Sequence, residues 1–315
     1  MLSKKSLRYS LAFCICGNLF LPSLLLANLV VHWKLDETSG LVASDTAGGN
    51  NGTLFNFPVD NSQWNPGQID GALLFDGVDD YVEISGYKGV TGTQSRTVFA
   101  WIKTSTTGQI VNWGIASTGQ KWVFRVQDSN GVAGAIRAKV ANGYIVGSTP
   151  VWDGQWHHVA AVLESDGLPN IDEVRLYVDG QLETVSAVIS QSINTSAAND
   201  VTIGVFASST SPLYFNGLID DARIYDHALT QAEIKLAAGL PNSPPMVDGG
   251  PDQSIKVTYS TLMNATVTDD SLPDPPGEVT ILWEKVSGPG IVTFDPNAWK
   301  IRSPRFLQLA FMCCV

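Results

Sequence analysis

The stretch that decides the fold is Trp152–Val185, which reads WDGQWHHVAAVLESDGLPNIDEVRLYVDGQLETV. Two runs rich in β-branched and aromatic residues flank a polar loop at Glu164–Asp172. The pair Asp179-Gly180 suits the positive φ angles of a two-residue hairpin turn. We therefore expect a three-stranded antiparallel meander.

Side chains alternate along the strands of this meander. Adjacent residues point to opposite faces, so His157 and His158 cannot hold one ion between them, and we expect both to be packed, hydrogen-bonded structural residues. Val174, Leu176 and Val178 share one face. This is the half-buried pattern of a sheet in a β-sandwich.

The phrases WHHVA at Trp156–Ala160 and LYVDG at Leu176–Gly180 resemble the laminin-G-like (LamG-like) family. Two further phrases, WKLDETSG at Trp33–Gly40 and GALLFDGVDDYV at Gly71–Val82, carry the same resemblance. It implies an all-β fold, a concanavalin A-like jelly-roll β-sandwich, over residues 28–240.

The strand and helix signals agree with this fold class. Thr230 and Glu233 form a capping box, which predicts a short helix that ends near Gly239. Short strands separated by Gly, Ser and Asn clusters predict a two-sheet sandwich; they are expected at Arg96–Lys103, Ile110–Ile115, Trp122–Gln127, Ala135–Val140 and Val201–Phe206.

The first 27 residues have the pattern of a secretory signal peptide. Lys4, Lys5 and Arg8 precede an interrupted apolar run that ends at Ala27. We expect a secreted protein, extracellular or at the cell surface. Loss of this segment would remove three positive charges and no carboxylates from a net charge of −11, which leaves −14. So acidic a chain is unsuited to nucleic acid and to anionic membranes.

A second β module is expected after the proline-rich linker at residues 241–245. The phrase WEKVSGP at Trp283–Pro289 resembles PKD-like domains of the immunoglobulin type, and residues 246–298 are too few for a complete one. Residues 299–315 turn basic and end in Cys313 and Cys314 before Val315. We expect this tail to be unstructured, as a lost reading frame or a truncation near Asn297 would leave it.

Calcium is the cofactor that the acidic residues favour. Carboxylates and loop carbonyls suit this hard ion, and LamG-like domains often carry a calcium site. The candidates are Asp36 with Glu37, the turn Asp76–Asp80, and Asp220 with Asp221. We expect Asp36 and Asp220 to be the ligands of a structural Ca²⁺, because the first and last strands are neighbours in this fold. Plain acidic turns are the alternative.

Sugar binding needs exposed aromatic rings beside amide and carboxylate acceptors. Four tryptophans lie in or near predicted loops: Trp64, Trp113, Trp122 and Trp152. Trp33, Trp101 and Trp156 lie within strands, where core packing is expected. We expect Trp113 and Trp122 to be the ligand-binding residues.

The sequence argues against catalysis by the jelly roll. A retaining glucanase of this fold carries a Glu-x-Asp-x-Glu strand that brings two carboxylates about 5 Å apart, and no such run occurs here. We expect a secreted, non-catalytic recognition or adhesion module that binds glycans or extracellular protein surfaces. The alternative is an accessory binding region of a larger secreted hydrolase or lyase.

Overall fold

The structure is a computed structural model that describes residues 29–207, 209–241, 246–248, 260–268, 292–294 and 308–314. The chain divides into two compact units, Ser23–Leu240 and a unit formed by Met1–Pro22 with Pro241–Val315. The predicted signal peptide at residues 1–27 and most of the linker at 241–245 lie outside the described residues.

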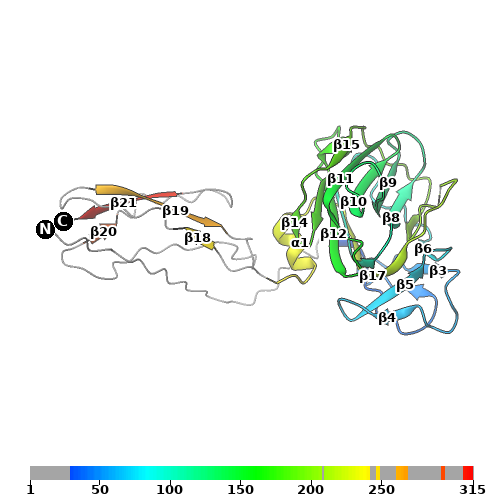
Figure 1. Ribbon diagram of the computed structural model, residues 1–315. Coiled ribbons are helices and arrows are strands. Elements are labelled where there is room, and N and C mark those ends of the chain that lie inside the picture. Colours follow the sequence, from blue (N-terminus) through cyan, green and yellow to red (C-terminus); the bar gives the residue numbers. More distant parts are fainter. Residues whose placement is uncertain are drawn as a thin grey trace. The chain divides into compact units, whose positions relative to one another are not determined.

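The unit Ser23–Leu240 is a sandwich of two antiparallel sheets (Figure 1). This architecture confirms the predicted concanavalin A-like jelly roll. The eight-stranded sheet has the order β14-β13-β12-β7-β17-β5-β4, with β1 paired to β17. The nine-stranded sheet has the order β15-β11-β10-β9-β8-β16-β6-β3-β2.

The strands of the eight-stranded sheet are β1 (Leu29–Trp33), β4 (Trp64–Pro66), β5 (Gly71–Asp76), β7 (Arg96–Thr104), β12 (Trp156–Leu163), β13 (Arg175–Val178), β14 (Gln181–Leu182) and β17 (Asn216–Tyr225). Those of the nine-stranded sheet are β2 (Val42–Ala43), β3 (Gly52–Phe55), β6 (Tyr81–Ile84), β8 (Gly108–Gly114), β9 (Lys121–Val126), β10 (Ala135–Val140), β11 (Gly143–Pro150), β15 (Ala187–Ile189) and β16 (Val201–Ile203).

The predicted meander is β12, β13 and β14. Asp179 and Gly180 both have positive φ, 49° and 72°, as a two-residue hairpin turn requires. The polar loop before β13 contains one 3₁₀ turn, η1 (Ile171–Glu173). The meander prediction is confirmed.

The core lies between the two sheets. Val159 and Ala161 on β12 and Val98 and Ala100 on β7 point into it and are fully buried. Such apolar burial is the main stabilising contribution in a sandwich held together without disulfides.

The outer face of the eight-stranded sheet is covered by the helix α1 (Gln231–Ala237). Thr230 and Glu233 form the predicted capping box at its start. The helix buries a second apolar cluster that includes Phe99, Ala160 and Tyr177. Tyr177, on the face of β13 opposite to Leu176, is therefore buried as well.

Strand β17, the last of the jelly-roll unit, is irregular at Asp220 and Asp221. β17 pairs with β1, as predicted for the first and last strands, but its register with β7 shifts between Asp220 and Arg223. Asp221 has a positive φ of 51°, and Asp220 and Asp221 are both buried. In a regular strand these two neighbours would point to opposite faces, but the irregularity lets both side chains be buried.

In the second unit, four described strands form one sheet of order β18-β19-β21-β20. They are β18 (Met246–Asp248), β19 (Ser260–Thr268), β20 (Val292–Phe294) and β21 (Gln308–Cys314). β21 lies in the tail that the sequence predicts to be unstructured, and it pairs with β19. The similarity to PKD-like domains stays a prediction.

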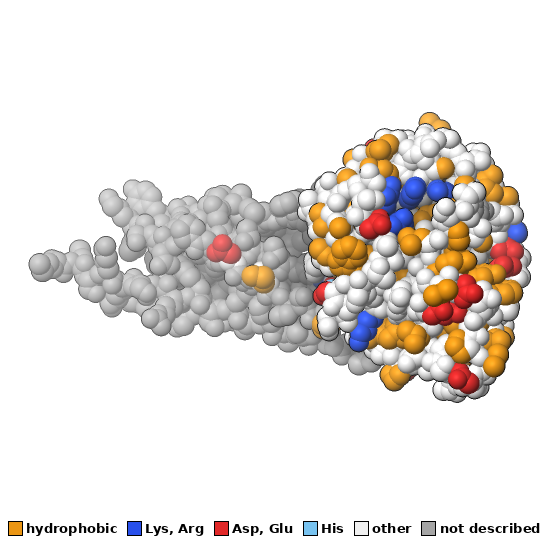
Figure 2. Space-filling view, turned by 45° about the vertical axis from the view of Figure 1, so that its right-hand side comes forward, with side chains coloured by type: hydrophobic (Ala, Val, Ile, Leu, Met, Phe, Trp, Pro, Cys, Tyr) orange, Lys and Arg blue, Asp and Glu red, His pale blue; other side chains and the backbone are white. Residues whose placement is uncertain are grey.

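Figure 2 shows one face of the jelly-roll unit, on which Lys and Arg side chains gather in one place. Within the described part of the chain, no helical segment combines the length and the apolar character that crossing a bilayer requires.

Candidate functional site

A cleft of about 460 Å³ opens where the loop after β1 meets the β4–β5 hairpin. Its lining combines one aromatic ring with carboxylates and an amide. The lining residues are Asp36, Glu37, Thr38, Trp64, Asn65, Pro66, Asp70 and Gly71. This volume lies within the range of roughly 300–1,000 Å³ that is usual for small-molecule sites.

Trp64 is the aromatic side of the cleft. Its indole is half-buried, because part of it packs against the core. Nε1 donates a hydrogen bond to the carbonyl oxygen of Gly40 at 3.0 Å, and the neighbouring Gln63 Nε2 donates to the same oxygen at 3.1 Å. These two hydrogen bonds hold the start of β4 against the loop after β1, which forms the other wall of the cleft. The indole ring of Trp64 therefore has a fixed orientation.

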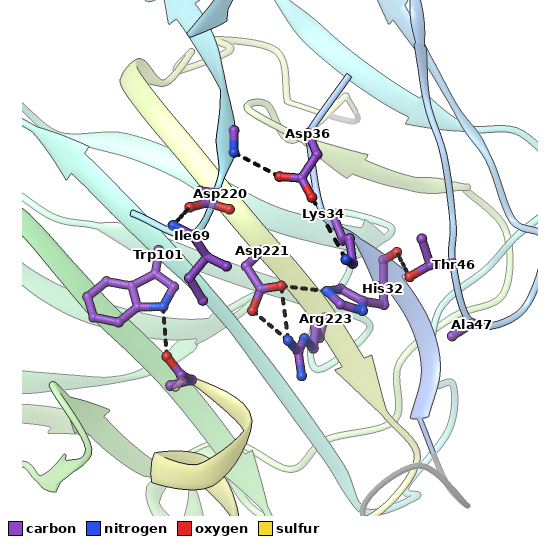
Figure 3. A network of polar contacts seen from close by, with 12 residues as sticks. His32, Lys34, Asp36, Thr46, Ala47, Ile69, Trp101, Asp220, Asp221 and Arg223 are labelled. Carbon is purple, nitrogen blue, oxygen red and sulfur yellow. Dashed lines mark hydrogen bonds and ion pairs between the residues drawn. The ribbon is translucent and has the colours of Figure 1, made fainter. Parts of the chain in front are cut away.

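Asp36 and Asp220 hold the turn of the same hairpin (Figure 3). Asp36 Oδ1 accepts a hydrogen bond from Gly71 N at 2.8 Å, and Asp220 Oδ2 accepts from Gln68 N and Ile69 N at 2.9 and 2.8 Å. A Cβ atom on Gly71 would lie 2.8 Å from Asp36 Cα, so the backbones pack closely there. The two carboxylates predicted as metal ligands thus position the cleft wall.

The carboxyl group of Asp220 holds its proton more tightly than an exposed aspartate does. Burial, helped by the neighbouring carboxylates of Asp221 and Asp36, outweighs the lowering effect of the two backbone hydrogen bonds and raises the pKa of its carboxyl group to about 7. Its second oxygen, Oδ1, is buried and has no hydrogen-bond partner among the described residues.

These two residues do not by themselves make a Ca²⁺ site. Of their four carboxylate oxygens, Asp36 Oδ1 and Asp220 Oδ2 accept backbone hydrogen bonds, and Asp36 Oδ2 lies 3.9 Å from the Lys34 ammonium. Two carboxylates supply at most four of the six to eight oxygen ligands that Ca²⁺ takes, so the calcium site stays a prediction.

The third predicted calcium candidate is the turn Asp76–Asp80. Carboxylate oxygens of Asp76, Asp79 and Asp80 lie within 4.8 Å of one another. Asp76 Oδ1 accepts from Val78 N at 2.7 Å, and Asp80 Oδ2 accepts from Asp76 N at 3.0 Å. Hydrogen bonds within the turn therefore account for the gathering of these carboxylates.

Beside the cleft, Asp221 bridges two basic groups. Its Oδ1 lies 2.5 Å from His32 Nε2 and 3.0 Å from an Arg223 guanidinium nitrogen (Figure 3). Burial alone would raise the pKa of Asp221, but His32 and Arg223 outweigh it and lower the pKa. This triad joins β1 to β17 and stabilises the side of the sheet from which the cleft is built.

A protein-family model described as the concanavalin A-like lectin/glucanases superfamily matches residues 76–235. The chain belongs to this superfamily. The cleft residues lie before the matched stretch. No curated protein matches the sequence.

Several solved structures resemble the chain distantly. Domain 4 of AbnA, a GH43 extracellular arabinanase from Geobacillus stearothermophilus solved with arabinotriose, is 22% identical, with a TM-score of 0.49 over 67% of this chain and 98% of that one. The binding domain of Paraclostridial Mosquitocidal Protein 1 is 14% identical, with a TM-score of 0.42 over 67% of this chain and 52% of that one. A mutant Trypanosoma rangeli sialidase is 15% identical, with a TM-score of 0.42 over 66% and 32%. At this distance they say nothing about what the present chain binds.

The predicted ligand-binding residues Trp113 and Trp122 are not at the surface of this superfamily member. They lie on β8 and β9 with 1% and 0% of their area exposed. Their rings stack at 5.9 Å, and the buried Arg96 guanidinium lies 5.2 Å from the Trp122 ring. Both side chains face the core, so they cannot stack on a sugar, and the prediction is corrected.

The two histidines of the meander are separated, as predicted. His157 Nδ1 lies 2.9 Å from Asp179 Oδ2, and this hydrogen bond raises its pKa. His158 is fully buried between the rings of Phe99 and Trp101. Burial lowers the His158 pKa to about 3, so the ring is neutral. Its nitrogens have no hydrogen-bond partner among the described residues, unlike the hydrogen-bonded histidine expected.

Sequence reasoning grouped Trp64 with the loop tryptophans but did not select it. A usable signal was present, because Trp64 lies in the stretch Asp60–Asp70, which is rich in Asn, Pro, Gly and Asp. Such residues form turns, and turns lie at the surface. Trp113 and Trp122 instead lie within runs of β-forming residues.

Proposed function

We propose that the jelly-roll unit is a non-catalytic glycan-binding module that takes a neutral sugar in the cleft lined by Trp64, Asp36, Glu37 and Asp70. The observation that carries the proposal is an indole of fixed orientation that shares a small cleft with carboxylate and amide groups. Membership of a superfamily of lectins and glucanases supports the same class of ligand.

The chemistry of the cleft suits hydroxyl groups. Glu37 Oε1 accepts a hydrogen bond from Ser44 N at 2.8 Å, whereas Glu37 Oε2 is buried without a hydrogen-bond partner among the described residues. Asp70 is exposed and Asn65 is half-buried, so sugar hydroxyls can donate to their side-chain oxygens, and the C–H face of a pyranose or furanose can pack on the indole. Carboxylates repel anions, so the ligand of this cleft is uncharged.

The engagement of the carboxylates supports a binding rather than a catalytic role. Asp36 Oδ1 and Glu37 Oε1 accept backbone hydrogen bonds that hold the walls of the cleft. The sequence also lacks the Glu-x-Asp-x-Glu strand of retaining glucanases. The same module could serve, after secretion, as an accessory region of a larger carbohydrate-active enzyme, which is the second arrangement that this function allows.

Titration calorimetry of the full chain with neutral oligosaccharides tests the proposal. Arabinotriose, cellotriose and xylotriose serve as probes, and reducing ends are measured in parallel. We expect one of these sugars to bind without turnover and Trp64→Ala to weaken its binding by about 2 kcal/mol, or roughly 30-fold, because an aromatic side chain at the centre of a site commonly contributes that much.

The matched control is Trp156→Ala, which removes another half-buried indole from β12, outside the cleft. It should leave the binding constant unchanged. Equal weakening by both variants, or release of reducing ends by the wild-type chain, would contradict the proposal.

A further inference from the structure

Four basic side chains lie together on the outward face of the nine-stranded sheet. Lys121 and Arg125 are on β9, and Arg137 and Lys139 are on β10. On each strand they are an even number of positions apart and so share a face, which points away from Trp122, Phe124, Ile136 and Ala138 in the core. Figure 2 shows Lys and Arg side chains gathered in the upper part of the jelly-roll unit, with only a few acidic side chains around them. We name these four residues the basic face.

The basic face is not neutralised by the protein. Arg125 and Arg137 lie directly opposite each other across the strand pair, and like charges in that position are destabilising. Asp128 lies 3.4 Å from Arg125. Within residues 29–241, no carboxylate forms an ion pair with Lys121, Arg137 or Lys139. Burial, together with the charges of the other three groups, lowers the pKa of Lys121 to about 8.

This clustering is unusual for so acidic a chain. Residues 29–241 contain 22 carboxylate side chains and 11 lysines and arginines, and four of those eleven lie on the basic face. Three of these four cations have no ion pair within residues 29–241, and only Arg125 has one, with Asp128. An anion bound among them would relieve their mutual repulsion.

Polar groups without partners accompany the basic face. Arg137 has 5% of its area exposed, and its Nε has no hydrogen-bond partner among the described residues. Gln109 pairs with Arg125 in register, and Asn112 lies in the next outward row of β8. Gln109 Oε1 and Asn112 Oδ1 are buried acceptors that likewise have no hydrogen-bond partner in the described part of the chain. Lys121, Arg125 and Lys139 are half-buried, so they are the groups of this face that a ligand can reach.

Two loops border the basic face. On one side the Phe206 ring lies 5.1 Å from Lys121 Nζ, and Val205 O accepts from Asn112 Nδ2 at 3.1 Å. On the other side Val132 N donates to Ser186 Oγ at 3.2 Å. The Arg137 guanidinium lies 3.8 Å from the Tyr144 ring centroid, which fixes its plane. The four cations therefore lie between these two loops, and aromatic rings help to position Lys121 and Arg137.

We propose that the basic face is a second binding site, distinct from the cleft, and that it takes an acidic glycan through carboxylate or sulfate groups. The cations require anionic oxygens, for which Arg gives bidentate recognition. The half-buried Tyr144 ring beside Arg137 can pack against the C–H face of a sugar. An acidic oligosaccharide offers both anionic groups and such C–H faces, which an acidic peptide of glutamates does not.

The test is titration of the full chain with tetragalacturonate and with a heparin tetrasaccharide, which distinguish carboxylate from sulfate. The carboxyl-reduced tetragalacturonate, which is neutral, and poly-glutamate are the comparison ligands. At least one acidic oligosaccharide should bind, and the variant Lys121→Gln/Lys139→Gln should bind it at least about tenfold more weakly, because each lost charge-assisted bond is worth that much.

Arg175→Gln is the matched control, since it removes an exposed cation from β13 in the other sheet, where Arg175 pairs with Glu164. The Arg175→Gln variant should bind acidic oligosaccharide as the wild type does. Trp64→Ala should also bind it normally, because Trp64 belongs to the cleft and not to the basic face. The double variant should keep its thermal midpoint, because it loses like-charge repulsion. Lys139→Gln alone repeats the test with a smaller change.

The proposal is overturned if neither acidic oligosaccharide binds, if the neutral tetramer or poly-glutamate binds equally well, or if the glutamine variants bind as the wild type does. Binding of acidic oligosaccharide together with failure of every neutral sugar would refute the cleft proposal while supporting this one.

Discussion

The pH dependence of stability tests the structure of the cleft wall at Asp220. The pKa of this carboxyl is raised mainly by burial, to about 7 in the folded protein against 3.8 for an exposed aspartate. The folded state therefore binds more protons than the unfolded state between these two pKa values. The contribution of Asp220 to stability is greatest below pH 4 and is lost as the pH rises towards 7.

The size of this effect follows from the pKa difference. About three pKa units correspond to about 4 kcal/mol of destabilisation above pH 7, and about 3 kcal/mol of that falls between pH 5 and pH 8. The variant Asp220→Asn keeps an acceptor for Gln68 N and Ile69 N and does not ionise. Its stability relative to the wild type should therefore rise by about 3 kcal/mol over this interval.

Urea unfolding followed by tryptophan fluorescence at pH 5, 6, 7 and 8 measures this difference. Seven of the nine tryptophans lie between Trp33 and Trp156, so the signal reports the jelly roll. Asp166→Asn, on an exposed loop, removes one charge elsewhere and should track the wild type. A constant difference between Asp220→Asn and wild type across the four pH values would refute the assignment of a protonated, buried Asp220.

Three further outcomes follow from the structure. Thr230→Ala removes the side chain that caps α1 at Glu233 N, so it should cost about 1 kcal/mol in urea unfolding, whereas Thr230→Ser should not; equal loss in both would rule out the cap. Gly71→Ala places a Cβ atom 2.8 Å from Asp36 Cα and should cost about 1–3 kcal/mol and weaken sugar binding; wild-type stability would show that the turn is not closely packed. EDTA should leave the thermal midpoint of the chain unchanged, because the carboxylates of Asp36 and Asp220 are already engaged by backbone amides; a drop that Ca²⁺ restores would show that an ion binds.

The sequence predicts the parts of the fold that have strong local signals. The turn at Asp179-Gly180 and the cap at Thr230 depend on a few adjacent residues, and both are confirmed. The strand Ala135–Val140 is predicted with its observed bounds. The strand Gly143–Pro150 is not predicted, because its glycines and terminal proline are typical of turns.

The site depends on tertiary contacts, which local patterns do not contain. Whether Asp36 and Asp220 bind an ion or cap a turn depends on which backbone amides reach them, and those belong to residues 68–71, far from Asp220 in sequence. The burial of Trp113 and Trp122 depends on strand register. The alternation of Lys121 with Arg125 and of Arg137 with Lys139 does indicate a shared face, but their proximity requires the pairing of β9 with β10.

The most direct test of the central claim compares wild type and Trp64→Ala by titration with the neutral trisaccharide that the wild type binds best. A module that holds sugar against this indole should bind it without hydrolysis, and Trp64→Ala should bind roughly 30-fold more weakly. The claim is contradicted if the variant binds with the affinity of the wild type, or if the wild type binds no neutral sugar at all.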